Sequence, residues 1–254
     1  SQMLRSLVGS EMCIRDSHIN GDNLKTILNT IRWMGIFALV TIFGAAGISA
    51  KEAPLFSALV KAGKLPPVTE RLPEIPLMLP VVDEIGQYGG ILRRAFLGPG
   101  DHNNYTRAVY DALVRFAPDG SQVVPHIASG WESNENFTEW IVRLRPGAKW
   151  SDGQPFTADD IMFWYNDILL NKDLMPGGAN WMKNDDGSMA KVKNLSNYMV
   201  KWSYKQPNSA FLVNLANMDG ADKSISNLVF IPAHYLKQFH PNHASKSNLD
   251  KKVN

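Results

Sequence analysis

The alternation of apolar and polar residues predicts two β-hairpins in the middle of the chain. The side chains of residues 138–145 alternate between the two sides of a strand, and a turn at residues 134–136 joins this strand to a preceding one at residues 130–133. The second hairpin covers residues 191–204, with its turn at residues 194–197. The residues of the first hairpin that we expect on one side of its sheet are Trp140, Val142 and Leu144.

A spacing of three and four residues predicts a helix that begins at Thr157. The Thr157 side chain can cap this helix, and Asp160 can answer the cap as in a capping box. The same spacing predicts a helix over residues 105–116, which the turn-forming residues 118–120 would end. The apolar face of the capped helix consists of Ile161, Trp164, Tyr165, Ile168 and Leu169. Shorter helices are predicted at residues 56–60, 210–217 and 232–239.

Residues 51–90 form a proline-rich lead-in to a domain that we place at residues 91–254. Five prolines between residues 66 and 80 remove amide donors, which excludes a regular helix or a central strand there. We expect the lead-in to run extended across the surface of the domain, a flexible linker being the alternative. Residues 91–97 are then predicted to be the first buried strand of the domain.

The first fifty residues consist of two segments that we do not assign to the folded domain. Residues 1–17 match a translated sequencing-library adapter, the alternative being a genuine polar extension. Residues 18–50 are predicted to be a signal peptide, because two basic residues precede an uncharged stretch that ends in small residues. Cleavage is expected after Ala50, which would release the protein into the periplasm. An uncleaved membrane anchor is the alternative.

Composition is that of a globular protein and adds little about partners. The 254 residues are 44% hydrophobic and 20% charged, and the net charge of +2 is spread along the chain. The chain has no polybasic run of the kind that would indicate a nucleic-acid partner. The single cysteine, Cys13, lies in the excluded segment, so we expect no disulfide, no thiolate nucleophile and no cysteine-bound metal.

The order of these turns, caps and strands resembles that of the family 5 extracellular solute-binding proteins, which include receptors for oligopeptides, dipeptides and nickel. The resemblance is specific because it joins many separated turn and cap positions. The clearest local signal among them is SDGQPFTADDI at residues 151–161, where the turn and the helix cap follow each other. The resemblance is dense over residues 88–170 and looser beyond them. The segments that carry it are residues 110–114, 125–133, 140–161 and 231–235.

The resemblance implies an α/β fold of the class II periplasmic binding protein type. It implies a monomeric receptor whose two lobes close on a small, peptide-like solute and present it to the permease of an ABC importer. Because the chains of the family are much longer, we expect an N-terminal fragment. Residues 91–254 would be an incomplete first lobe, with a hairpin-rich mixed α+β subdomain at about residues 105–205.

The resemblance also places two loops toward the solute cleft of such a receptor. One follows the first strand, and the other follows the capped helix. Amides and aromatic rings there can bind a peptide backbone or stack on a ligand, the alternative being ordinary surface loops. The predicted solute-contact residues are His102, Asn103, Asn104, Tyr105, Asn180 and Trp181.

We predict neither catalysis nor a bound metal or cofactor. The paired aspartates at residues 159–160 and 185–186 are adjacent in sequence, whereas glycosidase-type chemistry needs two carboxyl groups that face each other. His240 and His243 lack a third ligand in the sequence around them, so we expect solvated surface histidines. Two alternatives to a receptor remain: an exported hydrolase or carbohydrate-active domain, and a lone binding or sensing module.

Overall fold

The computed structural model describes residues 51–95, 97–98, 111–217 and 229–253. The chain divides into two units, residues 1–50 and residues 51–254, and the described residues all lie in the second. The segments that we assign to an adapter and to a signal peptide lie outside the described residues.

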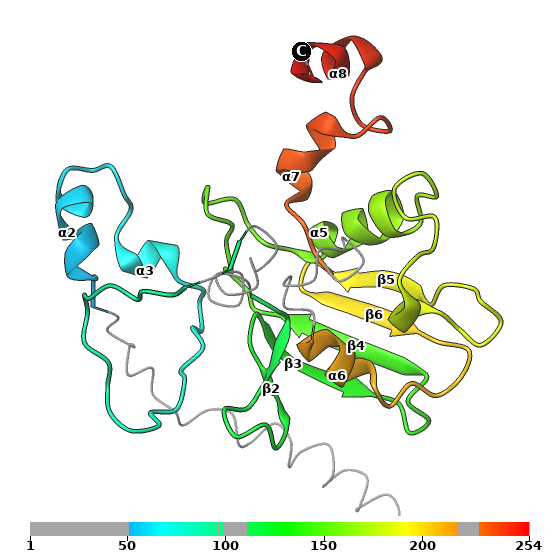
Figure 1. Ribbon diagram of the computed structural model, residues 1–254, viewed down its shortest axis with the longest axis horizontal. Coiled ribbons are helices and arrows are strands. Elements are labelled where there is room, and N and C mark those ends of the chain that lie inside the picture. Colours follow the sequence, from blue (N-terminus) through cyan, green and yellow to red (C-terminus); the bar gives the residue numbers. More distant parts are fainter. Residues whose placement is uncertain (1–50, 96, 99–110, 218–228, 254) are drawn as a thin grey trace, which may run out of the picture. The chain divides into compact units, whose positions relative to one another are not determined.

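A four-stranded antiparallel sheet, in the order β3-β4-β6-β5, confirms both predicted hairpins (Figure 1). The two central strands pair Trp140 with Trp202 and Val142 with Val200, and all four side chains are buried. The residues between them are less buried, so one face of the sheet forms part of the core. The strands are β3 (Ala128–Ser133), β4 (Glu139–Leu144), β5 (Lys191–Ser196) and β6 (Met199–Ser203).

A second, two-stranded sheet corrects the helix predicted at residues 105–116. Its strands are β1 (Val114–Phe116) and β2 (Val123–Pro125), and residues 105–110 lie outside the described residues. Helical spacing places Leu113 and Phe116 on one face, yet Leu113 is buried and Phe116 is exposed. The turn after β1 reverses the chain and supplies a partner strand, so pairing between strands outweighs the local helical pattern.

The first buried strand predicted at residues 91–97 is also wrong. Residues 91–95 belong to no helix or strand, and the side chains of Ile91 and Leu92 are 79% and 80% exposed. An apolar run becomes a strand only where another strand pairs with it. The strands of the described residues pair among themselves in the two sheets above, and neither sheet includes this segment.

The helix predicted to begin at Thr157 is confirmed as α5 (Ala158–Phe163), which continues directly as the π-helix η2 (Trp164–Leu169). Its five predicted core residues are all buried. The helices besides α5 and η2 are α2 (Pro54–Lys61), α3 (Val68–Arg71), η3 (Asn180–Met182), α6 (Phe211–Ala216), α7 (Ala233–Leu236), η5 (Lys237–Phe239) and α8 (Lys246–Val253). Among them, α2, α6 and the pair α7 and η5 confirm the predicted short helices.

The prediction that the prolines of the lead-in exclude a helix is wrong for the short helix α3, which fits between Pro67 and Pro73. The lead-in contacts the loop that follows β4. Arg145, which is buried, donates from Nη1 to the carbonyl oxygen of Ile75 at 2.7 Å and from Nη2 to that of His126 at 3.2 Å. The Glu74 amide donates to the carbonyl oxygen of Pro146 at 3.2 Å. Gly147 has a φ of 77°, and a Cβ there would lie 3.0 Å from the Glu74 nitrogen. A glycine at this turn therefore allows the two segments to approach closely.

The buried carboxyl group of Asp160 connects three segments. Its Oδ2 accepts from the Thr157 amide at 3.0 Å, which completes the predicted capping box, and from the Trp150 indole at 3.2 Å. Its Oδ1 accepts from the Ala233 amide at 2.9 Å, at the start of α7. One side chain thus fixes the start of α5, the preceding loop and a segment that lies 73 residues further along the chain.

Replacement of Asp160 by alanine should lower the free energy of unfolding by about 3 kcal/mol or more, because buried donors lose a strong acceptor. Asp159→Ala is the matched control, since Asp159 is exposed on the same turn. It should cost about 0.5 kcal/mol through the helix dipole. Urea unfolding followed by circular dichroism measures both. Equal losses in the two variants would contradict the central role of Asp160.

Candidate functional site

Asn180 and Trp181 lie in η3, a short turn that the core supports. The Trp181 ring stacks on the buried Trp164 ring, with centroids 6.2 Å apart and planes at 14°, and it also contacts Phe211. Trp181 is half-buried, whereas Asn180 is exposed and accepts a hydrogen bond at Oδ1 from the Lys183 ammonium at 3.0 Å. A fixed aromatic ring therefore lies beside an exposed amide.

Of the six predicted solute-contact residues, the structure describes only these two. The other four, His102, Asn103, Asn104 and Tyr105, lie outside the described residues. Their assignment to a solute site stays a prediction.

The Tyr204 hydroxyl group contacts η3 from the core. Its hydroxyl lies 3.5 Å from the carbonyl oxygen of Trp181 and 3.6 Å from the Met182 sulfur. Burial raises the pKa of the Tyr204 hydroxyl well above its usual value, because the charged form would lose its hydration. The pKa of Tyr165, another buried tyrosine, is raised for the same reason.

Alkaline pH should therefore destabilise the protein. In the unfolded chain a tyrosine ionises near its ordinary pKa of about 10, whereas folded Tyr204 stays neutral. The stabilising contribution is complete below pH 10 or so and is lost as the pH rises further. Tyr204→Phe should reduce this loss, measured by urea unfolding between pH 8 and pH 11 or so. Tyr235→Phe, at a half-exposed tyrosine, should leave the loss unchanged; the same reduction in both variants would contradict the assignment.

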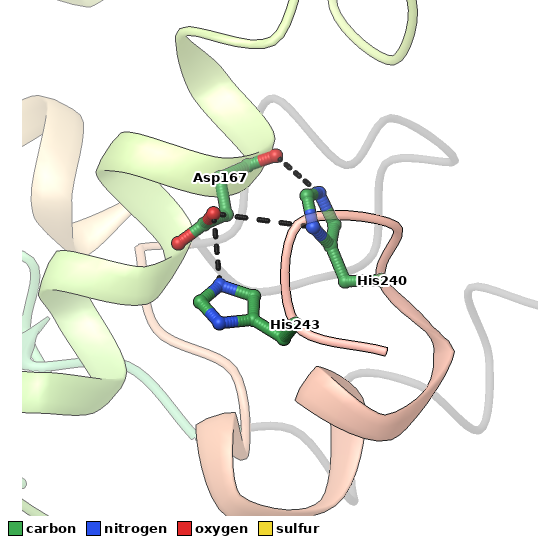
Figure 2. Close-up of side chains that lie close together, drawn as sticks. All are labelled: Asp167, His240 and His243. Carbon is green, nitrogen blue, oxygen red and sulfur yellow. Dashed lines mark hydrogen bonds and ion pairs between the residues drawn. The ribbon is translucent and has the colours of Figure 1, made fainter. Parts of the chain in front are cut away.

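A second cluster brings Asp167 of η2 against two histidines that follow η5 (Figure 2). The His243 Nε2 lies 3.0 Å from the Asp167 Oδ1, and the His240 Nδ1 lies 3.9 Å from the same oxygen. The His240 Nε2 lies 3.0 Å from the Asp167 carbonyl oxygen. Both imidazole rings contact the edge or face of the Phe163 ring.

The prediction that both histidines are solvated surface residues is wrong for His240, which is 5% exposed. The third polar partner that the local sequence lacks is Asp167, which lies 73 residues earlier. Sequence analysis assigned no role to Asp167. The only signal for it was its place on the capped helix, between two residues of the predicted apolar face.

The adjacent aspartate pairs serve structural contacts in the described part of the chain. Asp160 is the buried acceptor described above, and Asp186 binds the Lys205 ammonium and the Ser188 hydroxyl. These hydrogen bonds hold the pKa of the Asp186 carboxyl group well below its usual range. No described helix is both long and apolar enough to cross a membrane.

Residues 122–253 match the profile of the bacterial extracellular solute-binding proteins, family 5 Middle. The periplasmic alpha-galactoside-binding protein of Rhizobium meliloti (strain 1021) is 34% identical over 168 residues, which cover 58% of this chain and 24% of the relative. The probable D,D-dipeptide-binding periplasmic protein DdpA of Escherichia coli (strain K12) is 31% identical over 140 residues, which cover 53% and 25%. The chain thus spans about a quarter of the length of these curated relatives.

Solved structures agree with the sequence relatives. The oligopeptide-binding protein OppA superposes with a TM-score of 0.70 at 39% identity, over 80% of this chain and 30% of that chain. The periplasmic binding protein MelB from Agrobacterium fabrum C58, in complex with stachyose, gives 0.60 at 27% identity, over 79% and 32%. The predicted α/β fold of periplasmic binding proteins is therefore confirmed. The chain belongs to family 5 of the bacterial extracellular solute-binding proteins.

Proposed function

We propose that the protein is the substrate-binding component of an ABC importer, which captures peptides or similar solutes and delivers them to a membrane permease. The observation that carries the proposal is the family match over residues 122–253, which includes the capped helix and all four strands of the two hairpins. The work of such a protein is binding and lobe closure, with no chemical step.

Peptide-like solutes are the first choice for the ligand class. Support comes from the similarity to OppA and to DdpA, whose names describe oligopeptide and dipeptide binding. α-Galactosides are the second candidate, because the Rhizobium meliloti relative and MelB are described by an α-galactoside and by stachyose. We propose Asn180 and Trp181, with residues 102–105, as solute contacts. An amide and a fixed aromatic ring suit either a peptide backbone or a sugar face.

Isothermal titration of the full-length protein with a mixture of di- and tripeptides, and separately with stachyose, tests the proposal. We expect saturable binding of one class and no turnover when the bound solute is recovered and analysed by mass spectrometry. Recovery of cleaved solute would favour the hydrolase alternative. Failure of every solute to bind would favour the lone-module alternative.

Asn180→Ala tests the proposed contact within the same titrations. Loss of one hydrogen bond to the solute should weaken binding by about tenfold. Asn194→Ala is the matched control, because Asn194 is an exposed amide on β5 and is outside the proposed site. Equal affinity of Asn180→Ala and Asn194→Ala would contradict the role of Asn180 and leave the receptor assignment standing.

We further propose export to the periplasm through the signal segment at residues 18–50. Support comes from the curated relatives, which are named as periplasmic proteins. Amino-terminal sequencing of the exported protein should start at Lys51. A protein that stays in the membrane fraction with its first fifty residues attached would support the anchor alternative instead.

A further inference from the structure

We propose that Asp167, His240 and His243 form a binding site for a divalent transition-metal ion of the Zn²⁺ type (Figure 2). One ligand atom from each residue lies within 4.8 Å of the other two. The Asp167 Oδ1 is 3.0 Å from the His243 Nε2 and 3.9 Å from the His240 Nδ1. Tetrahedral zinc, with bonds of about 2.0–2.1 Å, holds its ligand atoms about 3.3 Å apart. The two observed separations bracket that value.

The orientation of His240 is the one that metal-binding histidines share. Its Nε2 donates to the backbone carbonyl of Asp167 at 3.0 Å, which leaves Nδ1 to face the Asp167 carboxyl group. A metal-bound histidine commonly donates its second ring N–H to a carbonyl or carboxylate, which fixes the ring and the tautomer. The backbone amide nitrogen of Asn242 lies 3.3 Å from the His240 Nδ1, and a metal ion bound to Nδ1 would replace this long hydrogen bond.

Burial and donor type both suit a transition-metal ion. The side chains of His240 and Asp167 are 5% and 17% exposed, whereas His243 is 32% exposed, so the cluster opens to solvent on one side. Three protein ligands leave the fourth tetrahedral position for water or another ligand. Two imidazole nitrogens with one carboxylate oxygen favour Zn²⁺, Ni²⁺ or Cu²⁺ over Mg²⁺ and Ca²⁺, which prefer all-oxygen sites.

The bound ion would tie η2 to the segment that precedes α8. Asp167 lies in η2, and the two histidines lie in the turn after η5, more than seventy residues later. Metal binding to the folded chain alone would raise its stability by mass action. None of the three cluster residues is a proposed solute contact, so metal binding can be tested without a solute.

Zn²⁺ titration of the full chain, after dialysis against a chelator, tests the proposal. Isothermal titration should show one site in the wild type, and Zn²⁺ should raise the melting temperature measured by circular dichroism. His243→Gln and Asp167→Asn should each weaken binding by about tenfold or more and abolish the rise in melting temperature. His234→Gln is the matched control: His234 also pairs with one aspartate, Asp152, at 2.7 Å, and it should leave Zn²⁺ binding unchanged.

Equal Zn²⁺ affinity in His243→Gln and the wild type would overturn the proposal, as would loss of binding in the His234→Gln control alone. Far-UV circular dichroism shows whether each variant folds. If a ligand variant fails to fold, zinc-edge X-ray absorption of the wild type decides. Two imidazole nitrogens and one carboxylate oxygen in the first shell support the site, and a shell of oxygen atoms alone overturns it.

Discussion

The described part of the chain depends on one buried carboxyl group. Asp160 accepts hydrogen bonds from the amide that begins α5, from the Trp150 indole and from the Ala233 amide. Each donor comes from a different segment, and none of them could be left unpaired in the interior without a cost of about 1–3 kcal/mol. One carboxyl group therefore provides both the local helix cap and a long-range contact. The residue that completes the capping box also accepts a hydrogen bond from the Ala233 amide.

Aromatic rings from several elements pack against one another in the core. Phe211 of α6 stacks on Trp140 at 5.1 Å between centroids and contacts Trp202 at 5.5 Å, so α6 packs directly on the central strands. Trp181 joins this layer to Trp164, because its ring contacts both Phe211 and Trp164. The ring that we propose as a solute contact is thus held by two buried rings, and a ring already held in place loses little conformational entropy when it binds a ligand.

The elements that could be predicted from the sequence are those whose determining contacts are local, and the predictions that were wrong concern elements whose contacts are distant. The hairpins and the cap at Thr157 depend on residues within a few positions, and both are confirmed. Leu113 and Phe116 follow an equally clear helical spacing, yet residues 114–116 form a strand because β2 pairs with them. The apolar run that begins at Ile91 shows the opposite error. It was predicted to be a strand, but it belongs to neither of the described sheets. Asp167 could not be recognised as a partner of His240, since no pattern connects positions so far apart.

The helix formed by α5 and η2 positions the capping carboxyl group of Asp160, the Trp164 ring and the Asp167 carboxylate of the proposed metal site. The π-helix η2 begins where the regular turns of α5 end, and its wider turn changes the direction of the side chains that follow. Ile168 and Leu169 remain in the core, while Asp167 turns to the histidines after η5. A π-turn is a feature common at functional sites. Here the helix that contains it packs its apolar side chains in the core and presents Asp167 to the histidines, so the core fixes the position of the carboxylate that we propose as a metal ligand.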